Sequence, residues 1–100
     1  MKIKAINISA RLWRDKQGTT YFTAKGYING VEKAHIKFQY GYGDHYIDAV
    51  DQRLQDLGLL PKRGRFVPLH KFCVENGIEL SAGAVHVRKR TDMYASWNSK

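Results

Sequence analysis

The sequence predicts an α+β domain: a three- to four-stranded antiparallel sheet with one main helix packed on one face and a second, short helix. Three observations lead to this fold class. Apolar and polar residues alternate over 2–14, 19–29 and 31–40, as in strands with one buried face. Asn29-Gly30 favours a two-residue type I′ turn, because both residues tolerate the positive φ it requires. Apolar residues at intervals of three and four then predict a helix over 44–57.

The alternation assigns each strand residue to one face of the sheet. A turn at Asp15-Lys16-Gln17-Gly18 connects the first two strands, so that the three form an antiparallel meander. The residues expected on its core face are Ile6, Ile8, Ala10, Leu12, Phe22, Ala24, Gly26, Ile28, Ala34, Ile36 and Phe38.

The helix predicted over 44–57 has an apolar side and an acidic side. Asp44 is a favourable N-cap, and Gly58 can end the helix in the left-handed conformation. The apolar side, which we expect against the sheet, consists of Ile47, Val50, Leu54 and Leu57. The acids expected to face solvent are Asp44, Asp48, Asp51 and Asp56.

The segment after Pro61 allows two interpretations. Pro68 at a first helical position predicts a two-turn helix that Asn76-Gly77 ends. Residues 78–90 can form a strand, or a helix capped by Ser81. Two valines and Gly83 disfavour the helix by about 1–2 kcal/mol, so we prefer the strand.

The chain has 100 residues, 43% of them apolar, which suffices for the core of one domain. We assign residues 1–92 to this domain and 93–100 to a polar tail. No apolar run approaches the roughly 18 residues of a membrane span, and Lys4 and Asn7 interrupt the start where a signal peptide would be apolar. The single cysteine, Cys73, cannot form an internal disulfide. We therefore expect a cytoplasmic protein that does not contact membranes.

The positive charge is unevenly distributed. The formal net charge is +8, although residues 44–57 carry four acids against one base. The other 86 residues therefore hold sixteen Lys and Arg against five Asp and Glu. Such an excess attracts polyanions, which points to nucleic acid or an acidic protein surface as the partner.

The outer face of the meander is the first candidate binding surface. By parity it gathers Arg11, Trp13, Tyr21, Lys25, Tyr27, Lys33, His35 and Lys37. Cations on such a face can meet phosphates, and rings can stack on unpaired bases. Cross-strand aromatic pairs also stabilise ordinary exposed sheets, so a purely structural role remains an alternative.

Two basic segments form the second candidate. Lys62-Arg63-Gly64-Arg65 is followed by Lys71, and no acid occurs from residue 57 through residue 74. Arginine forks in such a loop can bind phosphate through two donors at once, although a solvated loop explains the same residues. If Arg88-Lys89-Arg90 adjoins this loop in space, the two segments form one basic patch.

Residues 69–90 also have the outline of a helix-turn-helix, with a turn that is longer than usual and with Gly83 inside the second helix. The competing outline is three antiparallel strands followed by a packing helix. It resembles sheet-based DNA readers, such as certain domains of plant transcription factors and the arm-binding domains of some tyrosine recombinases. This resemblance covers residues 2–58 by architecture and contains no specific motif.

Catalytic and metal-binding roles find little support in the sequence. His70 and Cys73 lie three residues apart on the predicted short helix, but no second pair completes a zinc site. We expect no cofactor, no metal and no enzymatic activity, because no nucleophile stands in a recognisable arrangement with a base.

These observations predict a non-catalytic nucleic-acid-binding domain, with DNA as the favoured ligand. The alternative is a small adaptor or inhibitor that binds an acidic or nucleic-acid-binding surface of a larger protein assembly. Exposed sheet edges leave homodimer formation open. The predicted contact residues are Lys62, Arg63, Arg65, Lys71, Arg88, Lys89, Arg90, Arg11, Trp13, Tyr21, Lys25, Tyr27 and Lys37.

Overall fold

The computed structural model describes residues 2–63 and 67–90. Its first three strands are β1 (Ala5–Arg14), β2 (Thr20–Ile28) and β3 (Val31–Tyr40), which form the predicted antiparallel meander. At the β2–β3 turn, φ is 52° at Asn29 and 83° at Gly30, as a type I′ turn requires. The Asn29 side chain also accepts hydrogen bonds from the amides of Lys4 and Ala5, which ties this turn to the start of β1.

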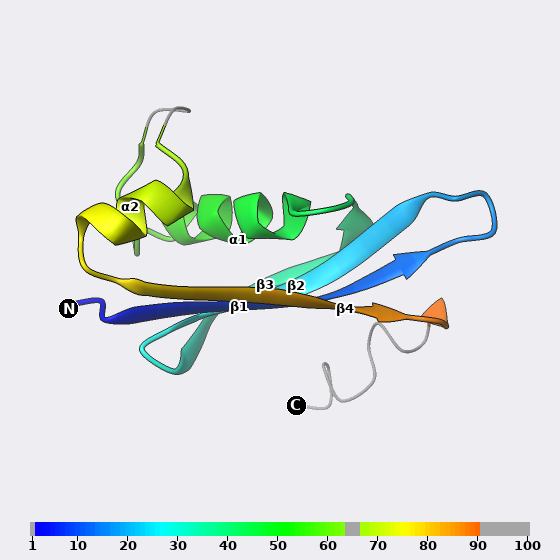
Figure 1. Cartoon of the computed structure of the whole chain (residues 1–100), viewed down its shortest axis with the longest axis horizontal. Helices are drawn as coiled ribbons and strands as arrows, with labels where there is room; N and C mark the ends of the chain where they lie inside the picture. Colours follow the sequence, from blue (N-terminus) through cyan, green and yellow to red (C-terminus); the bar gives the residue numbers. More distant parts are fainter. Residues whose placement is uncertain (1, 64–66, 91–100) are drawn as a thin grey trace.

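The rest of the chain forms a helical layer and a fourth strand. Helix α1 (His45–Asp56) and helix α2 (Leu69–Glu75) lie on the same side of the sheet, and β4 (Glu79–Val87) follows them (Figure 1). The strand order is β3-β2-β1-β4, and β4 runs parallel to β1. The predicted α+β fold is thus confirmed, with one parallel pair in the mostly antiparallel sheet.

The parallel pairing follows from the path of the chain. Strand β3 ends at Tyr40, level with Tyr21 at the start of β2, and the two helices carry the chain back to the opposite end of the sheet. Strand β4 then starts with Glu79 beside Ala5. The strand interpretation of residues 79–87 is therefore correct, and the helix-turn-helix outline is wrong.

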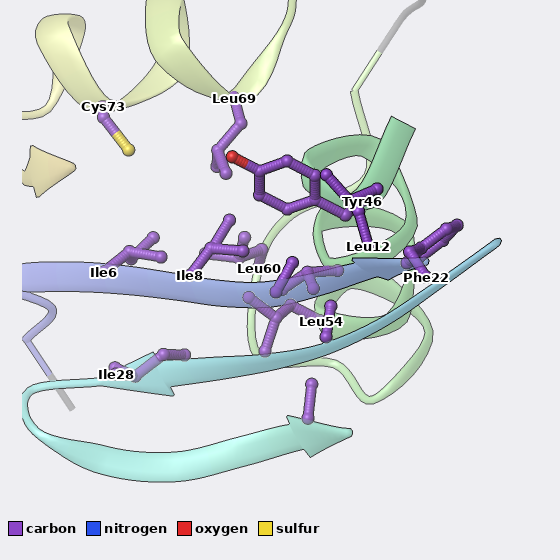
Figure 2. Close-up of a cluster of buried hydrophobic side chains, with 14 residues drawn as sticks. Ile6, Ile8, Leu12, Phe22, Ile28, Tyr46, Leu54, Leu60, Leu69 and Cys73 are labelled. Carbon is purple, nitrogen blue, oxygen red and sulfur yellow. The ribbon is translucent and has the colours of Figure 1, made fainter. Parts of the chain in front are cut away.

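The core lies between the sheet and the helices (Figure 2). Strands β1 and β2 provide most of the sheet side, with Ile6, Phe22 and Ile28 almost fully buried. The other buried apolar residues are Ile8, Ala10, Leu12, Ala24, Ala34, Tyr46, Val50, Leu54, Leu60, Leu69 and Cys73. The helix approaches the sheet closely at Gly26, where a Cβ atom would lie 2.5 Å from Cγ1 of Val50.

The core face predicted for β3 is wrong at one position. Phe38 does not join the core; its ring packs on Tyr21, with ring centroids 5.0 Å apart, on the opposite face of the sheet. The cause is an irregularity in the β2–β3 register, where Phe22 pairs with Gln39 but Ala24 pairs with Ile36. Two residues of β3 therefore lie opposite Thr23, and such a bulge reverses the parity of the residues that follow.

The orientation of α1 also differs from the prediction. Tyr46, Val50 and Leu54 are buried, whereas Leu57 is 43% exposed. Asp51 is buried as well, so its expected exposure to solvent is wrong. Asp44 stands at the N-cap position but makes no side-chain capping hydrogen bond.

Candidate nucleic-acid interface

The sheet face opposite the helices is the candidate interface, and we call it the outer face. In the described part of the chain, both helices cover the other side of the sheet (Figure 1). Near the end of β1, strand register and ring packing place one row of side chains on the outer face. Trp13 pairs with Tyr21 of β2 on one side and with Val87 of β4 on the other.

Five aromatic rings form a continuous cluster at this end of the outer face. Ring centroids are 5.8 Å apart for Trp13 and Tyr21, 5.0 Å for Tyr21 and Phe38, and 6.3 Å for Tyr21 and Tyr40. Tyr42 extends the cluster, 6.4 Å from Tyr40. Trp13, Tyr21 and Phe38 are half-buried against one another, whereas Tyr40 and Tyr42 are 59% and 66% exposed. We call these five residues the aromatic cluster.

A basic side chain lies against the aromatic cluster. The guanidinium carbon of Arg90 lies 4.9 Å from the centroid of the Phe38 ring, within range of a cation–π interaction. Arg90, Trp13, Tyr21 and Phe38 line a hollow of about 370 Å³ together with one acid, Asp15. Asp15 is engaged in the β1–β2 turn, where its carboxylate accepts hydrogen bonds from the amides of Gln17 and Thr19.

Other predicted contact residues have different surroundings. Lys25 is only 5% exposed, and its ammonium group pairs with Glu32 at 3.3 Å. Arg11 and Tyr27 are half-buried, and Lys37 is exposed on β3. Within the outer face, the exposed positive charge therefore lies near the β3 edge and after β4, rather than along β2.

Arg63 is an internal residue. Its guanidinium group donates two hydrogen bonds to the carboxylate of Asp51, at 2.6 and 2.7 Å, and a third from Nε to the carbonyl of Val67. It also lies 4.6 Å above the ring of Phe72. Only 7% of the Arg63 side chain is exposed. These contacts engage the guanidinium within the protein.

The two basic segments do not adjoin. Arg63 lies over the ring of Phe72 in α2, whereas Arg90 follows β4 and lies over the ring of Phe38 on the opposite face of the sheet. Lys62 and Lys71 are exposed in the helical layer, while Arg88, Lys89 and Arg90 are exposed beyond the sheet. Gly64, Arg65 and the tail 93–100 fall outside the described residues. Among the described cations, the condition for a single patch, that the two segments adjoin, is therefore not met.

The described residues contain no metal-binding group of three or more His, Cys, Asp or Glu side chains. His70 is exposed and Cys73 is buried, so the two do not share an open face of α2. Burial raises the pKa of the Cys73 thiol; the nearby Arg63 opposes this shift, and Asp51 adds to it. The thiol therefore stays protonated near neutral pH. Neither helix of the described chain is long and apolar enough to span a membrane.

The aromatic cluster contains three residues that the sequence argument did not assign to the site: Phe38, Tyr40 and Tyr42. They alternate at every second position, which is itself a signal for one shared strand face. Phe38 was assigned to the core because it has the same parity as Ala34 and Ile36. The bulge opposite Thr23 removes this conflict.

Comparisons with protein-family models, with curated proteins and with solved structures find no match to this chain.

Proposed function

We propose that the protein is a non-catalytic nucleic-acid-binding domain that holds single-stranded segments on its outer face. The observation that carries this proposal is the aromatic cluster, in which Tyr40 and Tyr42 are exposed aromatic residues. A duplex has no free base faces for such rings, whereas an unpaired strand exposes every base.

The energetics of stacking favour this use of the cluster. Base–aromatic stacking contributes about 1–3 kcal/mol per base and depends little on sequence. Tyr40 packs edge-on against Tyr21, and Tyr42 packs edge-on against Tyr40, which limits the rotamer entropy that stacking would cost.

Cations around the cluster supply the electrostatic part of the proposal. Arg90 lies at the cluster, Arg88 and Lys89 precede it, and Lys37 is exposed on β3. With about four phosphates neutralised, the log–log slope of affinity against salt should be near −3 for a single strand.

The test is a fluorescence-anisotropy titration with labelled oligothymidylate of about fifteen nucleotides at about 50 to 200 mM NaCl. Replacing Tyr40 by leucine removes one stacking ring and should weaken binding about 5- to 150-fold. The matched control is Tyr27→Leu, a half-buried tyrosine outside the cluster, for which we expect a much smaller change.

A second control concerns charge. The double variant Lys62→Gln/Lys71→Gln removes two exposed cations from the helical layer and should change affinity far less than Arg88→Gln/Arg90→Gln. Equal losses for the two double variants would show that charge acts without regard to the face, contrary to the proposal.

The second candidate function is a protein-interaction module. Tyr, Trp and Arg are also the residues that dominate protein interfaces, and the same cluster holds all three. If the unmodified protein fails to bind oligothymidylate, random duplex and RNA at low salt, the nucleic-acid proposal is wrong and the interaction module replaces it.

A further inference from the structure

The outward edge of β4 has the properties of a pairing site. Within residues 2–63 and 67–90, β4 pairs with β1 on one side only. The amide of Glu79 donates a hydrogen bond to the carbonyl of Lys4. This bond fixes which residues of β4 direct their backbone N–H and C=O groups towards β1: Glu79 and every second residue after it. The backbone groups of Leu80, Ala82, Ala84 and His86 are consequently directed away from β1.

The two edges of the sheet differ in how they discourage pairing. Strand β3 carries Glu32, Lys33 and Lys37, and its register with β2 is irregular at two places. Such charges and bulges are the usual protection of an edge strand. Strand β4 has an unbroken register with β1 and carries no Lys, Arg, Asp, Glu or Pro between Leu80 and Val87. Its edge is therefore unprotected, and Val85, beside this edge on the outer face, is 65% exposed.

The charges at the two ends of β4 indicate which strand fits this edge. Glu79 stands at the beginning of the strand, and Arg88, Lys89 and Arg90 follow its end. An antiparallel copy of β4 brings each Glu79 close to the cations of the other copy, whereas a parallel copy brings like charges together.

We propose that two copies of this chain form a homodimer by antiparallel pairing of their β4 strands around Gly83. In this register Ala82 faces Ala84 of the second copy, and Leu80 faces His86. All the outward backbone groups of Leu80, Ala82, Ala84 and His86 then find partners. Gly83 meets its own copy at the two-fold axis, where it offers no side chain to clash.

Antiparallel pairing places the equivalent faces of the two sheets on the same side. The two helical layers lie on one side of a continuous eight-stranded sheet, and the two outer faces join on the other. The homodimer can be tested apart from the proposed nucleic-acid binding, because the β4 edge and the aromatic cluster consist of different residues. Only the cations Arg88, Lys89 and Arg90 serve both proposals, and the Ala82→Lys variant leaves them unchanged.

The first experiment measures mass by sedimentation equilibrium over a range of protein concentrations. The unmodified protein should be a dimer at the upper concentrations. Ala82 is exposed, so Ala82→Lys leaves the monomer intact, and it should raise the dimer dissociation constant at least about tenfold. The matched control is Val31→Lys, which adds the same charge to the edge strand β3 and should leave the dimer unchanged. A monomer at every concentration, or an equal response to both lysines, would overturn the proposal.

The second experiment tests the antiparallel orientation by charge reversal. Glu79→Lys alone and Arg88→Glu/Lys89→Glu alone should each weaken self-association. Mixing the two variants should give heterodimers, measured by native mass spectrometry, in excess of either homodimer, because both reversed contacts become favourable. A statistical mixture would contradict antiparallel pairing. A monomer that pairs only with strands of other proteins would also count against a second copy as the occupant.

Discussion

Replacing Arg63 by methionine removes the guanidinium group that compensates the buried carboxylate of Asp51. The two side chains are only 7% and 12% exposed, and two short hydrogen bonds join them. Removing one partner of a buried ion pair costs about 3–5 kcal/mol, because it leaves an uncompensated charge in the interior. This cost is a large fraction of the about 5–15 kcal/mol by which a domain is stable.

Urea unfolding, followed by circular dichroism, measures this loss. With a denaturant slope of about 1.5 kcal/mol/M, the midpoint for Arg63→Met should fall by about 2–3 M. The matched control is Arg53→Met on the exposed side of α1, which should change the free energy of unfolding by no more than about 0.5 kcal/mol.

The double variant Asp51→Leu/Arg63→Met separates the pair from the packing of its parts. It removes both charges, so it should recover most of the stability lost by Arg63→Met. If Arg63→Met is as stable as Arg53→Met, or if the double variant loses the sum of both single losses, the guanidinium does not stabilise the fold by compensating Asp51.

Three further predictions concern the sheet and the core. Gly26→Ala should destabilise the protein by about 1–3 kcal/mol in the same unfolding assay, because the new methyl group would meet Val50; Gly83→Ala, with nothing within 4 Å, is the control. Equal stability of these two variants would contradict the close approach of α1 to β2. Cys73 should react with a thiol reagent at pH 8 at least about 100-fold more slowly in the native than in the unfolded protein, since it is 1% exposed and burial raises its pKa. Fast reaction of the native thiol would contradict this burial. Phe38→Ala should lower the free energy of oligothymidylate binding, measured by anisotropy, by more than it lowers the free energy of unfolding, measured in urea. The reason is that the Phe38 ring stacks on Tyr21 on the outer face.

The sequence predicted the fold well where the pattern was local. The alternation in β1 and β2, the Asn29-Gly30 turn and the main helix depend on neighbouring residues, and all three are confirmed. The parallel pairing of β4 could not be predicted in this way, because it depends on the path of the helices across the sheet.

The candidate site was harder to predict, for two physical reasons. A bulge in β3 moves Phe38 to the outer face. The alternation of apolar and polar residues in a sequence does not reveal where such a bulge occurs. Arg63 pairs with Asp51, twelve residues earlier. In the sequence both look like ordinary solvent-exposed charges, because nothing in the local pattern shows that they are buried together. Charge composition indicated a class of partner, but only the structure shows which cations lie together.

We expect single-stranded nucleic acid to contact the outer face through the aromatic cluster. The most direct measurement is a map of amide chemical-shift changes, recorded by NMR while unlabelled oligothymidylate is added to the isotope-labelled protein. We expect little change in α1 and the largest changes on the aromatic cluster: Trp13, Tyr21, Phe38, Tyr40 and Tyr42. Changes centred on Lys62 and Lys71 in the helical layer, or no changes at low salt, would contradict it.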